Sequence, residues 1–290
     1  MFDDADNEVA VEKNDKGFVI YASVPNFLIN LFIQALLIKD GYSMVHAAAF
    51  ENNNGDITLL PGAGGIGKTA LLGNMVKDHH YRLLGDDIIL LGENGTCLSY
   101  PRSFVLKEYH RSVYPEVFQR LNIKKGGNYD LKRFIVDNAP FTSVIKNILR
   151  SKKLYSKVTQ AINLTPYLAA VPVEEIFGTE SVCPQGNLEN ILFLERYEGE
   201  KTVINPIDTG ELSRRMFAII WHEWVGSMRQ LFSISAMGLF DLSHLFSCTA
   251  QIIHSAISGK QSQIISIPNR TNPKDLADTF NELSGLVKKY

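Results

Sequence analysis

A glycine-rich run between a β-prone segment and an apolar helical segment limits the possible folds of this chain more than any other pattern. The run matches the P-loop pattern G-x-x-x-x-G-K-[ST], in which a loop surrounds a phosphate group, with the residues Gly62, Ala63, Gly64, Gly65, Ile66, Gly67, Lys68 and Thr69. The β-prone segment, 57–60, lies ahead of the loop, and the apolar segment, 70–76, has the spacing of a helix. A strand, a phosphate loop and a helix in this order predict an α/β fold.

The chemistry of phosphate binding explains the residue types of this run. Glycines let several backbone N–H groups point at one anion, and a helix that begins near Gly67 adds its free N–H groups and its dipole. Lys68 can contact the outer phosphates, and the Thr69 hydroxyl can bind Mg²⁺. We therefore expect residues 62–69 and Ala70 to bind the phosphates of a nucleotide. The alternative is a chance glycine loop with a solvated lysine.

Composition limits the class of protein further. The chain has 290 residues, of which 45% are hydrophobic and 21% are charged, as in ordinary globular proteins. A formal net charge of −2 gives no reason to expect nucleic acid or a membrane as a partner. Three widely separated cysteines lack metal-ligand spacing, and the acidic first residues lack the basic start and apolar stretch of a signal peptide. We expect a cytoplasmic protein with reduced thiols.

The predicted elements divide the chain into three parts. Residues 1–110 hold an N-terminal region and the P-loop nucleotide-binding core, residues 111–185 a helical insertion that we expect to bind the acceptor, and residues 186–290 the rest of the core with C-terminal helices. An Asn-Gly turn predicts a hairpin that pairs strand 44–50 antiparallel with the P-loop strand. Further patterns predict strands or β-prone runs at 18–21, 81–91, 97–100, 188–194 and 263–267, and helices at 25–39, 212–232, 241–258 and 274–289.

Asp86 and Asp87 form a second candidate group of functional residues. They begin 18 positions after Lys68, which suffices for one short helix and one strand. An acidic residue at the end of a strand beside a P-loop is a common Mg²⁺ ligand. Adjacent side chains of a strand point to opposite sides, so the two carboxylates should differ in role unless a kink at Gly85 turns them. One would bind the metal and the other would act as a general base; a solvated acidic turn is the alternative.

The ordered motifs resemble one protein family. The segment Val45-His46-Ala47, the P-loop and the segment 82–88 follow one another as in the HPr serine kinase/phosphorylase family and the wider HPr-kinase-like group. That group shares a P-loop fold with phosphoenolpyruvate carboxykinase. The resemblance, over about residues 43–108, implies an HPr-kinase/carboxykinase-like mixed sheet with helices, a Mg²⁺-dependent kinase and a homo-oligomer. Tyr100-Pro101-Arg102 also looks like members found in biosynthetic clusters, and Arg102 could contact a phosphate.

The resemblance implies roles for five side chains by position. Asp86 would be the base that deprotonates the acceptor hydroxyl. Asp87 and Thr69 would hold Mg²⁺. His46 would lie near the transferred phosphoryl group, on which Lys68 also acts.

For three further features, a structural role is the alternative to a functional one. A lone histidine such as His46 often has a purely structural place in a core. Glu195 ends an apolar strand and could be a further acid of the site or a solvated residue. The segment 221–224, Trp-His-Glu-Trp, does not have the spacing of a zinc site, so we expect its aromatic rings to pack in the core.

These features together predict a kinase. It would transfer the γ-phosphoryl group of ATP or GTP, bound with Mg²⁺, to a hydroxyl of a peptide or protein serine or of a small metabolite. A nucleotide-binding regulatory protein without phosphotransfer is the alternative from another class. A carboxykinase-type enzyme fits less well, because the sequence offers no clear additional metal ligands.

Overall fold

The computed structural model of the chain describes residues 2–4, 9–15, 17–22, 27–100, 103–112, 114–123, 167–269 and 271. The chain divides into two compact units, one formed by Met1–Pro101 with Thr179–Tyr290 and the other by Arg102–Gly178. Residues 124–166 of the predicted helical insertion and the predicted helix at 274–289 lie outside the described residues. In the described part of the chain, no helix is both long enough and apolar enough to cross a membrane.

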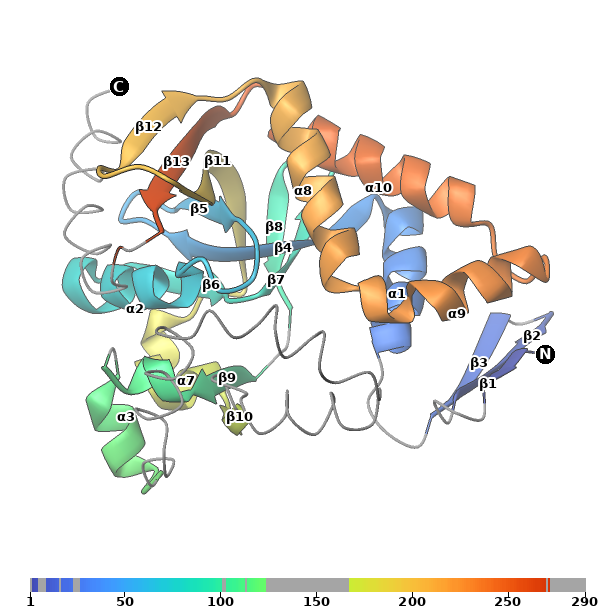
Figure 1. The fold of residues 1–290 in the computed structure, drawn as a ribbon, viewed down its shortest axis with the longest axis horizontal. Helices are drawn as coiled ribbons and strands as arrows, with labels where there is room; N and C mark the ends of the chain where they lie inside the picture. The colour runs from blue at the N-terminus through green and yellow to red at the C-terminus, as the bar shows by residue number, and fades with distance from the viewer. Residues whose placement is uncertain are drawn as a thin grey trace, which may run out of the picture. The chain divides into compact units, whose positions relative to one another are not determined.

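A mixed sheet forms the centre of the first unit (Figure 1). Among the described residues it has eight strands in the order β12-β13-β11-β5-β4-β7-β8, with β6 beside β4. β13, β11 and β5 run parallel, and the remaining pairs are antiparallel. The strands are β4 (Tyr42–Glu51), β5 (Asp56–Pro61), β6 (Arg82–Gly85), β7 (Ile88–Gly92), β8 (Thr96–Ser99), β11 (Gln185–Tyr197), β12 (Val203–Pro206) and β13 (Gln261–Pro268). The predicted mixed α/β sheet is confirmed.

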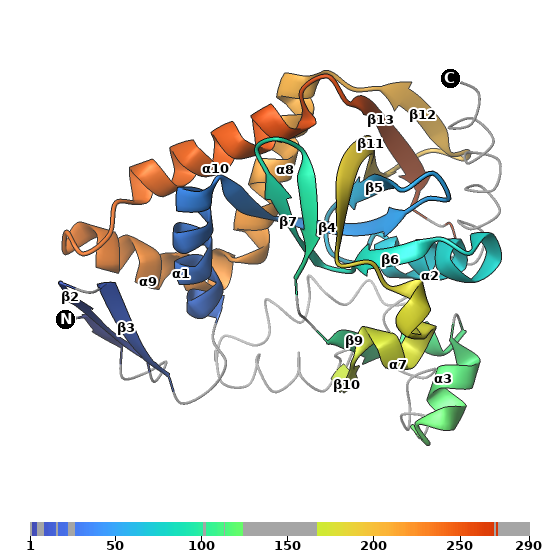
Figure 2. The same ribbon diagram turned by 180° about the vertical axis from the view of Figure 1, so that it is seen from behind.

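The pairings of the sheet form a closed circuit. The first residues of β11 pair with β8, and its later residues pair with β5 and β13. The circuit therefore runs β11–β5–β4–β7–β8 and back to β11, as Figure 2 shows from behind. The predicted hairpin is confirmed, because Ala47 pairs with Pro61 and Phe50 with Thr58 across β4 and β5.

Helices pack around this sheet. α2 contacts β4 and β6, while α8 and α10 contact each other and β4. The side chains of Asp208 and Asp241 cap α8 and α10 by accepting hydrogen bonds from the backbone N–H groups of Glu211 and His244, both at 3.0 Å. The helical elements of this unit are α1 (Phe27–Leu37), η2 (Ile38–Asp40), α2 (Lys68–His79), η4 (Thr179–Ser181), α8 (Thr209–Glu223), α9 (Val225–Ala236) and α10 (Leu242–Ile257).

The prediction of one helix at 212–232 is wrong. α8 ends at Glu223 and α9 begins at Val225, with Trp224 between them. Trp224 is buried and packs edge-on against Trp221 with ring centroids 5.5 Å apart. Burial of both rings in one cluster fixes the break, and it confirms the expected packing of these aromatic side chains.

A buried glutamine ties α1 to the sheet and to α10. The Gln34 amide nitrogen donates to the hydroxyls of Ser43 and Thr249 at 2.9 Å each, and its oxygen accepts from the backbone N–H of Met44 at 2.7 Å. Gln34 has no exposed surface, and both polar atoms of its amide are hydrogen-bonded. The network therefore fixes the positions of α1, β4 and α10 relative to one another. A smaller sheet consists of β1 (Phe2–Asp4), β2 (Val9–Asn14) and β3 (Gly17–Ala22). Its residues Val9 and Val11 belong to the same hydrophobic cluster as Trp221 and Trp224.

The second unit contains a strand pair, which the expectation of a helical insertion did not include. β9 (Phe104–Lys107) pairs antiparallel with β10 (Tyr167–Val171). η3 (Glu108–Ser112), α3 (Pro115–Arg120) and α7 (Val173–Phe177) complete its described elements. The acceptor-binding role of residues 111–185 stays a prediction.

Candidate functional site

The glycine-rich loop joins β5 to α2 as the sequence predicts. Gly62 pairs with Leu194 of β11, and a Cβ atom on Gly62 would lie 2.7 Å from the Leu194 carbonyl oxygen, so a larger residue does not fit there. Gly67 is the N-cap residue of α2 and has a φ of 110°, a backbone conformation that residues other than glycine rarely adopt. The free N–H groups at the start of α2 therefore face the loop.

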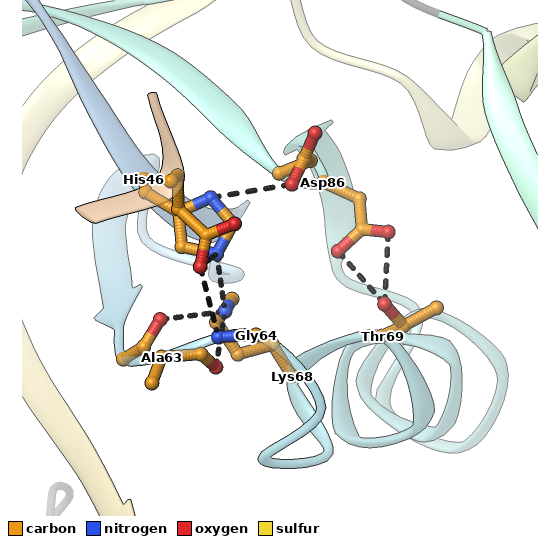
Figure 3. A network of polar contacts seen from close by, with 9 residues as sticks. His46, Ala63, Gly64, Lys68, Thr69 and Asp86 are labelled. Atoms are coloured by element: carbon orange, nitrogen blue, oxygen red, sulfur yellow. Dashed lines mark hydrogen bonds and ion pairs between the residues drawn. The ribbon is translucent and has the colours of Figure 1, made fainter. Parts of the chain in front are cut away.

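The side chain of Lys68 lies under the loop and is almost completely buried. Its Nζ donates to the carbonyl oxygens of Gly62 at 2.7 Å and Ala63 at 3.0 Å, and it lies 2.9 Å from Nε2 of His46 (Figure 3). Burial lowers the pKa of Lys68, while the charges of Asp86, Asp87 and Glu223 act in the opposite direction. The ammonium is thus held in one position by three acceptors.

His46 on β4 connects Lys68 to an aspartate. Because the Lys68 ammonium donates, Nε2 of His46 accepts, and the imidazole proton lies on Nδ1. Nδ1 is 3.2 Å from Oδ1 of Asp87. The three side chains form a chain of contacts in which the carboxylate orients the imidazole.

Asp86 instead lies beside the first turn of α2. The Thr69 hydroxyl donates to its carboxylate, with Oγ1 2.9 Å from Oδ2 and 3.2 Å from Oδ1 (Figure 3). Burial first, and the charge of Asp87 second, raise the pKa of Asp86 to about 6, against the Thr69 hydrogen bond and the charges of Lys68 and His46. Thr69 therefore contacts Asp86. The expectation that Thr69 and Asp87 hold Mg²⁺ stays a prediction.

A bend between β6 and β7 separates the two carboxylates. The run 81–91 forms two strands, β6 and β7, and Asp86 and Asp87 occupy the bend between them. Asp87 has a φ of 91°, a strained value that aspartate tolerates better than most residues, and its carbonyl accepts from the N–H of Ala47 at 3.2 Å. The kink that the sequence left open is present, and the carboxylates reach different partners.

The raised pKa of Asp86 leads to a stability prediction. The folded state disfavours the ionised carboxylate, so the free energy of unfolding should fall as the pH rises from about 4 through about 6. Asp86→Asn removes the charge but keeps an oxygen for Thr69, and it should add about 1–3 kcal/mol at pH 7.5 without Mg²⁺. Urea unfolding from pH 4 to 8 measures this gain, which should vanish toward pH 4. A gain independent of pH would contradict the electrostatic explanation.

Glu223 is a residue of this site that sequence reasoning missed. Its Oε1 accepts from the backbone N–H of Gly64 at 3.2 Å and lies 3.8 Å from Nε2 of His46. The contact joins residues 159 positions apart, and no motif surrounds Glu223. Only the three-dimensional structure, in which the end of α8 lies beside the loop, identifies it.

A pocket of about 450 Å³ lies on the β11 side of the loop. Residues 63–66, the end of β11 at 193–196 and one face of α8 line it. Glu195 holds Arg215 there at 2.8 Å and accepts from the Ser266 hydroxyl at 2.8 Å. Glu195 is thus a pocket residue, whereas Arg102 lies outside the described residues.

Comparisons with known proteins give distant structural similarity but no match by sequence. No protein-family model matches the chain, and no curated protein matches it by sequence. Among solved structures, the chain is similar to the Hpr(Ser) kinase/phosphatase from Coxiella burnetii, with 10% identity, a TM-score of 0.37, and coverage of 85% of this chain and 99% of that chain. The likeness is weak in sequence and in fold.

Proposed function

We propose that this protein is a Mg²⁺-dependent kinase that transfers the γ-phosphoryl group of a nucleoside triphosphate to a hydroxyl. The observation that carries the proposal is the contact network of the loop lysine, a histidine and two separated aspartates. Phosphoryl transfer needs donors for the phosphates, a metal and a base for the acceptor, and the network offers a group for each. The loop N–H groups would bind the phosphates, and Lys68 would do so by exchanging one of its three present acceptors for a phosphate oxygen.

The geometry supports exchanging the two expected roles of the aspartates. Thr69 and Asp86 present a hydroxyl and a carboxylate within 2.9 Å of each other, and oxygen donors of this kind suit Mg²⁺. Within the described residues, no group of three or more His, Cys, Asp or Glu side chains could hold a metal. Waters and phosphate oxygens would therefore complete the metal's shell, and the bound ion would neutralise phosphate charge.

Asp87 is the base in this proposal. Its carboxylate contacts His46, which in turn contacts Lys68, so it faces the same end of the phosphate chain as the ammonium. A base on a hydroxyl must reach the proton that it removes, and the bend at Asp87 gives its side chain a direction different from that of Asp86. The contact between His46 and Asp87 holds both side chains beside Lys68.

The pocket beside the loop would hold the nucleoside. β5, which leads into the loop, lies between β4 and β11; His46 is on β4, and the pocket is on the β11 side. In-line transfer puts the acceptor and the leaving group on opposite sides of the phosphorus. With the base on the β4 side, the nucleoside diphosphate belongs on the β11 side. Apolar walls with a few polar groups are typical of such a site.

A substitution that fills this pocket tests the assignment. Ala218 is exposed on the pocket face of α8, so Ala218→Trp should weaken MgADP binding about tenfold or more, since the ring competes with the nucleoside. Inorganic tripolyphosphate lacks a nucleoside and should bind the variant as it binds the wild type. Calorimetry measures both, with Ser255→Trp on the exposed face of α10 as the control. Equal losses for both ligands would reject the nucleoside pocket.

A transfer assay tests the function itself. The protein is incubated with γ-labelled ATP or GTP, Mg²⁺ and a panel of serine peptides and small alcohols, and the label is followed by mass spectrometry. Label on a hydroxyl supports the kinase. Tight nucleotide binding without labelled product, water included, would favour a regulatory nucleotide-binding protein instead.

A further inference from the structure

The carboxylate of Glu223 lies where a phosphate oxygen would be expected. It accepts from the N–H of Gly64, in the first half of the loop, and its charge acts on the buried Lys68 ammonium. It also lies 3.8 Å from the imidazole nitrogen that contacts Lys68. Glu223 thus uses the Gly64 N–H, a loop donor close to the place where the outermost phosphate of a bound nucleotide would lie.

We infer that Glu223 makes the site discriminate between nucleoside di- and triphosphates. The inference rests on the proposed function. A carboxylate and a terminal phosphate carry the same sign of charge and accept from the same donors, so they cannot occupy this place together. A diphosphate leaves the Gly64 N–H to Glu223, whereas a triphosphate must displace the carboxylate.

The backbone under Glu223 is held in place. Glu223 is the last residue of α8, and Trp221 and Trp224 on either side of it are buried in the same hydrophobic cluster. The Trp224 N–H closes the helix end on the carbonyl of Ile220. The side chain itself is about one-third exposed, with a relative exposure of 32%. Displacement therefore means a change of side-chain rotamer, and the carboxylate returns to Gly64 once the terminal phosphoryl group has left.

This arrangement sets the relative affinity for substrate and product. Binding of the terminal phosphate creates contacts with the loop and Lys68. It also breaks the contact that Glu223 already makes with Gly64. The wild-type protein should hence have a lower ratio of triphosphate affinity to diphosphate affinity than the same loop would have without Glu223. Neutralising Glu223 should remove this penalty for the triphosphate alone.

The experiment compares Glu223→Gln with the wild type. Calorimetry measures the Kd of MgADP and of Mg²⁺ with the non-hydrolysable analogue AMPPNP, or of the guanine pair if guanine binds more tightly. Glu223→Gln should bind the triphosphate analogue about tenfold more tightly, a change of about 1.4 kcal/mol, with ADP affinity within about twofold. Glu189→Gln removes the same charge from an exposed ion pair with Lys260 and should change neither value.

The other outcomes separate this inference from the proposed function. If wild type and variant bind both nucleotides and the two affinities change by the same factor, or not at all, the discrimination by Glu223 is rejected while the nucleotide site stands. If the wild type binds neither nucleotide, the proposed function fails and the inference fails with it. Glu223→Ala repeats the comparison without an amide, and a gain specific to the triphosphate must appear there too.

Discussion

Asp87→Asn should slow phosphoryl transfer by about 10²- to 10⁴-fold and leave nucleotide binding almost unchanged, because the variant loses a general base but no phosphate donor. Asparagine tolerates the positive φ of this position, so the backbone bend should persist. Its oxygen can still accept the Nδ1–H of His46. Single-turnover transfer with γ-labelled nucleotide gives the rate, and calorimetry gives the affinity.

The comparison of the two aspartates makes this result specific. If Asp86 binds the metal, Asp86→Asn should raise the Mg²⁺ concentration needed for half-maximal rate, whereas Asp87→Asn should not. Asp40→Asn, at an exposed position of η2, controls for the loss of one carboxylate. The opposite pattern, with the metal requirement changed only in Asp87→Asn, would restore the roles that the sequence resemblance implies.

Lys68→Met should weaken triphosphate binding by about 100-fold. In the proposed complex the ammonium would make charge-assisted hydrogen bonds to the phosphates, each worth about 1.5–3 kcal/mol, and about 2.8 kcal/mol corresponds to that factor. Methionine keeps the buried stem, so the loop should stay packed. Calorimetry with the Mg²⁺ complex of AMPPNP measures the loss, with Lys39→Met on the exposed side of η2 as the control. Undiminished binding would exclude the loop as the phosphate site.

Local sequence patterns predicted the parts of the site that neighbouring residues determine. The loop, the helix after it and the hairpin with the His46 strand all follow from short-range signals, namely glycines, an Asn-Gly turn and apolar periodicity. The contact between His46 and Lys68 follows from them, because the hairpin aligns β4 with the strand that leads into the loop. These elements needed no information from distant parts of the chain.

Long-range packing determines the parts that the sequence did not predict. The division of the run 81–91 at Asp86 and Asp87 depends on how β6 and β7 both pair with β4. The end of α8 depends on the burial of Trp224 rather than on a glycine or proline. Glu223 reaches the loop only because of that helix end, and no pattern within a few residues of it encodes a partner 159 positions away.

The closed circuit of strand pairings has a consequence for the divergence of such proteins. β5, β4 and β11, which carry the loop, His46 and the floor of the pocket, each have a hydrogen-bonded neighbour on both sides. Neither strand edge of these three is free to peel away, so they form a rigid frame. Substitutions at the pocket and at the end of α8 can therefore alter ligand preference without rebuilding that frame. Evolution can retune what this site accepts one side chain at a time.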